Sequence, residues 1–371
     1  MKKDGSDLII SVDNKIASVR TRTLDLSFNE ILDMYESDEL VISPEYQRLF
    51  RWSEGNQSRL IESLLLELPI PPIFVIERDD NVYELIDGLQ RISSYLHFRG
   101  ALKDRPEGEN ALKLSECDVV KELNGFSYED LPSALKIKLK RNFIRVEVIR
   151  KESDQRLRYY MFKRLNTGGE NLSAQELRNC TIRLLSPTFN DFIIEMSRND
   201  DYKKCIELVT TEKKDEKYDQ ELVLRYFAFK NDLDNYNHDI GDFLTEYMES
   251  VSDPDTPTTF NYKEEKRLFE VTFSTLANTL GQYSFSPKND KGSWISRFQS
   301  LHFEAITLGA LNATQELALD PIPLEKLDKI LNEIKSDQTF MTLTTGGGKN
   351  YNRQLRERIN FVKNKIVADM V

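Results

Sequence analysis

Cysteine and histidine are scarce in this 371-residue chain, which contains three of each. Cys117, Cys180 and Cys205 are too far apart in sequence for a disulfide framework or a metal knuckle, and such sparse cysteine fits a reducing compartment. The histidines are also scattered, and none has the spacing of a compact metal motif. The sequence therefore predicts neither a zinc finger nor a self-contained histidine–metal nuclease.

Long apolar runs are missing as well. No stretch approaches the ~20 apolar residues that a membrane-spanning helix needs, and the first ten residues lack the apolar centre of an export signal. No nucleophile motif of a Ser–His–Asp or Cys–His hydrolase is present. We therefore expect a cytoplasmic protein, and the chain is long enough for about two domains.

Charge is unevenly distributed. The net charge of −11 argues against a surface that coats nucleic acid broadly, because phosphate neutralisation needs clustered cations. Residues 136–164, however, contain eleven Lys/Arg against three acids, and residues 349–365 contain six against one. These two segments are candidate contacts for DNA or for an acidic partner, although a solvated helix face explains the second as well.

The most informative stretch is Glu84–Ile92, Glu-Leu-Ile-Asp-Gly-Leu-Gln-Arg-Ile. It predicts a strand, a tight turn at Gly88 and a helix that runs to Gly100. Free N–H groups at the helix N-terminus, the helix dipole and the cation of Arg91 together make a candidate anion site that suits phosphate. Alternatively, Asp87 caps the helix and Arg91 pairs with a neighbouring carboxylate.

Local patterns predict the elements around this turn. Ser27 with Glu30 and Ser53 are the expected N-terminal caps of two helices. The polar cluster 78–81 predicts a β-hairpin from strands 73–77 and 82–86, and alternation predicts a half-buried strand at 143–149. The polar, glycine-containing segment 103–127 is expected to be a surface excursion.

A second helix N-terminus is predicted further along the chain. Leu157, Met161 and Leu165 recur at helical spacing, and Asn166-Thr167-Gly168-Gly169 then favours a turn. Ser173 and Glu176 form the capping box of the next helix. The loop between them is either a plain helix–helix connection or a second part of the anion site.

These blocks resemble a known family. Asp87-Gly88-Leu89-Gln90-Arg91 is similar to the Asp-Gly-Gln-Gln-Arg signature of the N-terminal domain of GmrSD-type restriction systems, which has a ParB/sulfiredoxin-like nucleotide-binding fold. Three further blocks agree in the same order, and one residue departs from the pattern, because Leu89 replaces the first Gln. The agreeing blocks are Tyr46-Gln47-Arg48 with Trp52, Leu60 to Ser63 with the Pro69-Ile70-Pro71-Pro72 turn, and Arg164 to Gly169 with Leu172-Ser173 and Glu176-Leu177-Arg178.

The resemblance implies a nucleoside triphosphate and Mg²⁺ as ligands, held from opposite sides by the turn at Asp87 and the loop at Arg164. It implies catalytic roles for Asp87, Gln90 and Arg91. It also implies phosphate or nucleotide contacts from several residues and metal ligation by Asn166 and Glu176. The phosphate and nucleotide contacts are Gln47, Arg48, Gly88, Arg91, Arg164, Asn166, Thr167, Gly168 and Ser173.

The expected fold class is α+β. Residues 1–185 are predicted to form the ParB/sulfiredoxin-like domain, and residues 186–371 a mostly helical domain with stripes of Phe and Tyr that suit core packing. In the second domain the clearest helical spacing lies at 222–229, 243–248, 262–280, 294–311, 324–334 and 351–366. The Gly-rich stretch 344–349 lacks the spacing of a Walker loop and is expected to be a plain loop.

Three functions agree with this sequence. The first is an NTP-binding, NTP-hydrolysing component of a bacterial anti-phage defence system, which resembles GmrS without its His-Asn-His nuclease domain and regulates a partner nuclease encoded elsewhere. The second is a ParB-like protein that binds or nicks DNA itself. The third is a degenerate scaffold, since Leu89 departs from the signature.

Overall fold

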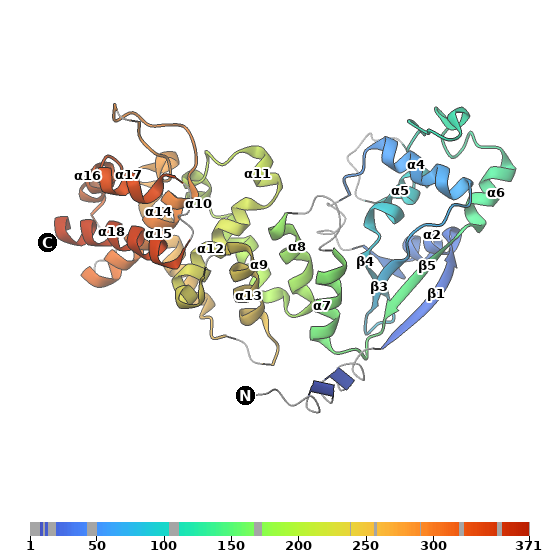
Figure 1. The fold of residues 1–371 in the computed structure, drawn as a ribbon, viewed down its shortest axis with the longest axis horizontal. Coiled ribbons are helices and arrows are strands. Elements are labelled where there is room, and N and C mark those ends of the chain that lie inside the picture. Colours follow the sequence, from blue (N-terminus) through green and yellow to red (C-terminus); the bar gives the residue numbers. More distant parts are fainter. Residues whose placement is uncertain are drawn as a thin grey trace. The chain divides into compact units, whose positions relative to one another are not determined.

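The computed structural model shows an α+β protein with a five-stranded sheet in its N-terminal part and helices through the rest (Figure 1). The residues that it describes are 8–9, 12–13, 20–42, 50–103, 111–166, 173–237, 239–255, 258–289, 291–318, 323–346 and 351–370. The chain divides into two compact units, Met1–Glu170 and Asn171–Val371, and each is described by itself. The predicted boundary lay at residue 185, so α8 (Ala174–Thr181) falls in the second unit rather than the first.

The sheet of the first unit has the order β1-β5-β3-β4-β2. Its strands are β1 (Thr21–Ser27), β2 (Leu40–Val41), β3 (Ile73–Glu77), β4 (Tyr83–Asp87) and β5 (Phe143–Ile149). The predicted hairpin is confirmed, because β3 and β4 pair antiparallel around a turn in which Asn81 has a φ of 62°. The predicted alternation of β5 is also confirmed: Ile144, Val146 and Val148 are buried.

Helices pack over this sheet and against one another (Figure 1). They are α2 (Phe28–Glu36), α4 (Glu54–Leu65), α5 (Leu89–Arg99), α6 (Ser133–Arg141) and α7 (Gln155–Asn166). The hydroxyls of Ser27 and Ser53 cap α2 and α4 as predicted, accepting from Glu30 N and Asn56 N. The strand that leads into the Gly88 turn, β4, contacts α7, and its neighbouring residues Leu85 and Ile86, which point to opposite faces, are both buried.

The segment 103–127 is only partly the predicted surface excursion: most of its described residues are exposed, but apolar residues anchor it in the core. Leu112, Leu114 and Cys117 are buried, and the side chain of Glu62 on α4 is also buried. Glu62 Oε1 accepts hydrogen bonds from the backbone N–H groups of Val119 at 3.1 Å and Val120 at 2.6 Å. Sequence polarity misled here because the polar residues alternate with apolar anchors, and backbone groups find a buried carboxylate instead of water.

The described part of the second unit consists of helices joined by loops, and its only strand-like pairing is one isolated bridge. Its helices are α8 (Ala174–Thr181), α9 (Pro187–Ser197), α10 (Asp200–Cys205), α11 (Thr211–Asp215), α12 (Tyr218–Asp232), α13 (Ile240–Ser252), α14 (Tyr262–Ala277), α15 (Ser300–Leu317), α16 (Leu324–Ile334), α17 (Gln338–Thr344) and α18 (Asn352–Met370). One expected helix start was wrong: α15 begins at Ser300, whereas Trp294 pairs with Lys288 in the bridge. Trp294 stacks on Tyr283 at 5.2 Å, and this aromatic contact replaces helical packing.

A chain of charges crosses the interior of the second unit. Arg178 and Arg225 both pair with Glu221, at 3.3 and 2.8 Å, and Arg225 reaches Glu304 at 3.1 Å. Glu304 also binds Arg358, which is 1 % exposed. The pairs join α8, α12, α15 and α18, so Arg358 serves the core of this unit and not its surface.

Candidate functional site

The turn between β4 and α5 has the predicted geometry. Gly88 is the N-cap of α5, with φ 101° and ψ 13° in the left-handed region. A Cβ at this position would lie 2.3 Å from Cγ2 of Ile73 on the neighbouring strand. Both the backbone conformation and the lack of space therefore require glycine.

The first turn of α5 has no side-chain cap. The first intrahelical bond runs from Ile92 N to Gly88 O, and Gly88 brings no acceptor of its own. In contrast, serine hydroxyls cap α2 and α4. Because N–H groups at a helix start carry the positive end of the dipole, this arrangement favours an anion at the turn.

Arg91 is engaged within the turn. Its Nη2 donates to Asp87 Oδ2 and to the carbonyl oxygen of Pro72, each at 2.9 Å. Its Nε is buried and has no hydrogen-bond partner among the residues that the structure describes. The ion pair with a neighbouring carboxylate is thus present, as the alternative interpretation expected, and the carboxylate is Asp87 itself, which does not cap α5.

Gln90 connects the turn to the chain segment before α4. Its Oε1 accepts from Arg51 N and Trp52 N, both at 3.1 Å. Trp52 O in turn accepts from Gln57 Nε2 at 2.8 Å, and Gln57 Oε1 lies 2.7 Å from His97 Nδ1. The predicted contacts Gln47 and Arg48 lie outside the described residues, just before the segment that Gln90 holds.

Sequence reasoning missed the Gln57–His97 pair. Both side chains are buried, and the pair joins α4 to α5. A histidine in the last turn of a helix and a glutamine four residues after Ser53 form no motif. Their positions on the apolar faces of two adjacent helices were the usable signal. Leu89 is also buried, so an apolar core side chain occupies the place of the family's first Gln.

The second block is only partly described. Arg164 is exposed in the last turn of α7, Asn166 ends that helix with a side chain outside the described residues, and Thr167 and Gly168 lie outside as well. The predicted capping box of α8 is confirmed: Ser173 Oγ accepts from Glu176 N at 3.2 Å, and Glu176 Oε2 accepts from Ser173 N at 3.0 Å. Glu176, a predicted metal ligand, is buried in that cap.

The predicted site residues are divided between the two units, and the second block itself spans the division, because Arg164 and Asn166 lie in the first unit. Asp87, Gly88, Gln90 and Arg91 belong to the first, and Ser173 and Glu176 to the second. Arg178 anchors the second block inside its own unit by donating to Gly241 O at 3.0 Å and to Thr245 Oγ1 at 3.1 Å. That both blocks hold one triphosphate therefore stays a prediction.

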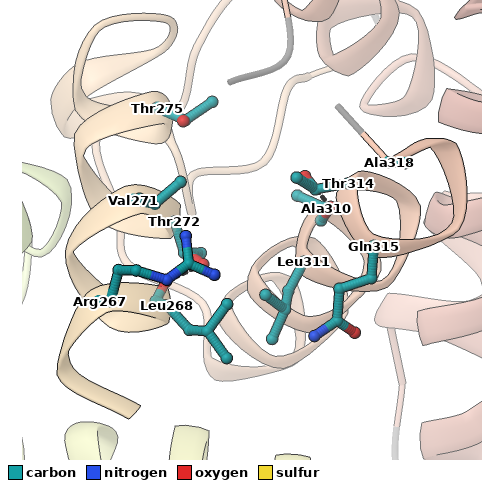
Figure 2. Close-up of a pocket in the computed structure, with 10 residues that line it drawn as sticks. All are labelled: Arg267, Leu268, Val271, Thr272, Thr275, Ala310, Leu311, Thr314, Gln315 and Ala318. Atoms are coloured by element: carbon teal, nitrogen blue, oxygen red, sulfur yellow. Dashed lines mark hydrogen bonds between the residues drawn. The ribbon is translucent and has the colours of Figure 1, made fainter. Parts of the chain in front are cut away.

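The hollow between α14 and α15 has a different chemistry. It encloses about 220 Å³, and Figure 2 shows side chains of the two helices facing one another across it. Leu268, Val271 and Leu311 line it, and the hydroxyl of Thr272 is used within its own helix, donating to Leu268 O at 2.7 Å. Arg267 at its rim is bound to Glu264. This pocket suits apolar groups and offers no phosphate contacts comparable with the turn at Gly88.

Two features are absent from the described residues. No helix among them has both the length and the apolar character required to cross a bilayer. Nor do they contain a cluster of three or more His, Cys, Asp or Glu side chains placed to hold a metal ion.

Comparison with known proteins gives one match. A family model described as the N-terminal domain of GmrSD restriction endonuclease matches residues 28–183. Neither the curated proteins nor the solved structures gave a match. The matched range includes the turn at Gly88, the segment that Gln90 holds and the capping box of α8. Residues 28–183 therefore belong to the GmrSD restriction endonuclease N-terminal domain family, and the protein is related to restriction systems.

Proposed function

We propose that the turn Asp87–Arg91 binds the phosphates of a nucleoside triphosphate with Mg²⁺. The observation that carries this proposal is the α5 N-terminus, which has a left-handed glycine, no side-chain cap and a cation in its first turn. In this account the protein is a cytoplasmic, NTP-hydrolysing component of a bacterial restriction-type defence system. It regulates a nuclease encoded elsewhere and has a ParB-like nucleotide-binding domain.

Each residue of the turn has a distinct role in this proposal. Backbone N–H groups of α5 and the guanidinium of Arg91 bind phosphate oxygens, and Gln90 fixes the segment that carries Gln47 and Arg48. Asp87 places a negative charge beside the same phosphates. Mg²⁺ offsets that repulsion, since carboxylate and phosphate oxygens are ligands that it prefers.

The second block supplies the other phosphate and metal contacts. We propose phosphate or nucleotide contacts from Arg164, Thr167, Gly168 and Ser173, and Mg²⁺ ligation by the side-chain oxygen of Asn166. We propose Glu176 as a further Mg²⁺ ligand, since a carboxylate whose Oε2 accepts from Ser173 N still has lone pairs for a metal. Metal titrations at fixed nucleotide test the proposed ligand role of Asn166. Asn166→Ala should raise the Mg²⁺ concentration at the midpoint of nucleotide binding, whereas an unchanged midpoint would remove Asn166 from the site.

Thermal melting of the full chain tests nucleotide binding. A ligand at a hundred-fold excess over its Kd stabilises the native state by about 2.7 kcal/mol. At least one of ATP, GTP, CTP and UTP, each added with Mg²⁺, should raise the melting temperature of the protein. If none does so at millimolar concentration, the degenerate-scaffold alternative replaces this proposal.

DNA binding through residues 136–164 is the second candidate function. Ion pairs between cations of this segment and nearby carboxylates argue against it, because those cations are partly neutralised. Lys136 pairs with Glu129, Lys138 with Glu67, and Arg145 with Asp25. The cations of the last helix are likewise paired with carboxylates: Arg353 with Glu357, Arg356 with Asp234, Arg358 with Glu304, Lys363 with Glu316 and Lys365 with Asp337.

Plasmid assays separate a regulator from a nuclease. Pure protein incubated with supercoiled plasmid, Mg²⁺ or Mn²⁺ and each triphosphate should leave the plasmid intact, because the proposed site binds phosphate without a nuclease motif. Nicking that follows the protein through purification and disappears in Asp87→Ala would favour the DNA-nicking alternative.

A further inference from the structure

The first unit has a large groove that adjoins the Gly88 turn through Pro72. It encloses about 900 Å³ between α6, the segment 67–72 and the ends of β1 and β5. Three exposed apolar side chains line it: Leu68 and Ile137, each 49 % exposed, and Phe143, 62 % exposed. Such a concentration of exposed apolar surface marks a docking site.

The residues of α6 that line the groove have the spacing of one helix face, which is the spacing expected of a helix that binds a partner segment. Ala134, Ile137, Lys138 and Arg141 recur at i, i+3, i+4 and i+7 and all line the groove. Lys138 is paired with Glu67, whereas Arg141 is exposed and has no carboxylate partner among the described residues. The groove therefore suits a segment that combines apolar side chains with an acid.

The N-terminal segment of the same unit has this composition. Residues 4–13, Asp-Gly-Ser-Asp-Leu-Ile-Ile-Ser-Val-Asp, carry three acids and no Lys or Arg. Within it Leu8 and Ile9 are 66 % and 63 % exposed, and Val12 is also exposed. Leu8, Ile9 and Val12, in an acidic stretch of sequence, and a groove whose cation Arg141 has no carboxylate partner among the described residues thus lie exposed in one unit.

The chain is long enough to bring the two surfaces together. The strand from Arg20 to Asp25, which lines the groove, covers roughly 17 Å at about 3.3 Å per residue. The segment from Val12 to Arg20 reaches roughly 27 Å when extended. In the described sheet β1 is an edge strand, so its outer edge is not paired with another described strand.

We propose that residues 4–13 dock in this groove, with Leu8, Ile9 and Val12 against Leu68, Ile137 and Phe143 and an aspartate against Arg141. The docked segment then lies beside the phosphate-binding turn, because Pro72 lines the groove and its carbonyl oxygen accepts from Arg91. The proposal does not depend on nucleotide binding.

Disulfide trapping in the full chain tests the docking. Ser11→Cys is combined with Ala134→Cys in the groove wall, which leaves the apolar contacts intact. The control pairs Ser11→Cys with Val119→Cys, an exposed position of the same unit outside the groove. Ser11→Cys alone reports the background from Cys117, Cys180 and Cys205.

The groove pair should form an intrachain disulfide about tenfold faster than the control pair, because docking raises the local concentration of the two thiols. Adding Arg141→Glu or Phe143→Ser should remove most of that advantage. Equal rates in the two pairs would overturn the proposal. Disulfides formed only between copies, seen as dimers in non-reducing gels, would also overturn it and assign the groove to a second copy.

Discussion

Gly88 is the residue on which the turn depends most directly. Its positive φ costs any other residue about 1–2 kcal/mol, and a Cβ 2.3 Å from Ile73 adds an overpacking cost of about 1–3 kcal/mol. Gly125 provides the comparison, since its φ is 92° and no atom lies within 4 Å of its Cβ position.

Gly88→Ala should therefore lower the free energy of unfolding by more than Gly125→Ala, by a margin of about 1–3 kcal/mol. Chemical denaturation of the two variants measures the difference. Equal losses would mean that β3 and the turn move apart without cost, and the close contact with Ile73 would then have no energetic role.

For individual residues, the sequence predicted the left-handed Gly88, the start of α5 and the capping box of Ser173 and Glu176. Each of these features is determined by residues within a few positions of it. It did not predict that Arg91 binds Pro72 O or that Gln90 holds Trp52. These contacts join segments that are far apart in sequence, and local patterns carry no information about them.

Elements are held together in this protein by buried polar side chains as well as apolar ones. Glu62 of α4 is 2 % exposed and gives the described part of segment 111–123 an acceptor for two backbone N–H groups. A buried donor left without its acceptor costs about 1–3 kcal/mol.

Glu62→Ala should lower the free energy of unfolding by about 1–3 kcal/mol, since two part-buried donors lose their acceptor. Glu62→Gln is the matched control, because its carbonyl oxygen can still accept and the side chain keeps its size. Denaturation midpoints compare the two. A glutamine variant as unstable as the alanine variant would show that the negative charge, rather than the acceptor, is what the segment requires.

Lys335, at the end of α16, links that helix to α15 and to the loop before it. Its Nζ donates to Ser286 O at 2.7 Å and lies 3.4 Å from His302 Nδ1. Burial, together with the nearby cation Lys288, lowers the pKa of Lys335 well below its usual value. Burial and the charge of Lys335 likewise lower the pKa of His302.

A lysine with a lowered native pKa makes stability depend on pH with a definite sign. Between the native pKa and the unfolded value of about 10.4 the unfolded chain binds one more proton, so the free energy of unfolding rises with pH by up to about 1.4 kcal/mol per pH unit. This contribution is complete above the unfolded pKa and is lost as pH falls through the native pKa.

Lys335→Met should flatten that rise, measured as urea unfolding between pH 7 and 10. Lys329→Met is a matched control, because Lys329 lies on the same helix and is exposed. A slope that Lys335→Met leaves unchanged would mean that Lys335 keeps its charge in the native state.

At the scale of the whole molecule, composition and periodicity predicted the α+β class and the helical C-terminal part. The division into units was harder to predict, because the family match continues to residue 183 whereas the first compact unit ends at Glu170. A family can extend across a structural division when its motif residues, such as Arg178, anchor the following unit. Sequence resemblance therefore located the turn more accurately than the domain boundary.

The central claim is that the Asp87–Arg91 turn binds the phosphates of a triphosphate. Its most direct test measures the Kd of fluorescent ATP, GTP, CTP and UTP analogues with Mg²⁺ by fluorescence anisotropy. The proteins compared are wild type, Arg91→Ala, Arg91→Lys and Arg150→Ala. Arg150 is the control because it is an exposed, ion-paired cation of the same unit at the end of another strand. Melting curves without nucleotide show whether each variant is folded.

Wild type and Arg150→Ala should bind the same triphosphate with similar Kd. Arg91→Ala should lose the binding while remaining folded, and Arg91→Lys should recover part of it, because lysine keeps the charge but cannot form the bidentate contact. Folded Arg91→Ala that binds the triphosphate as tightly as wild type would contradict the claim.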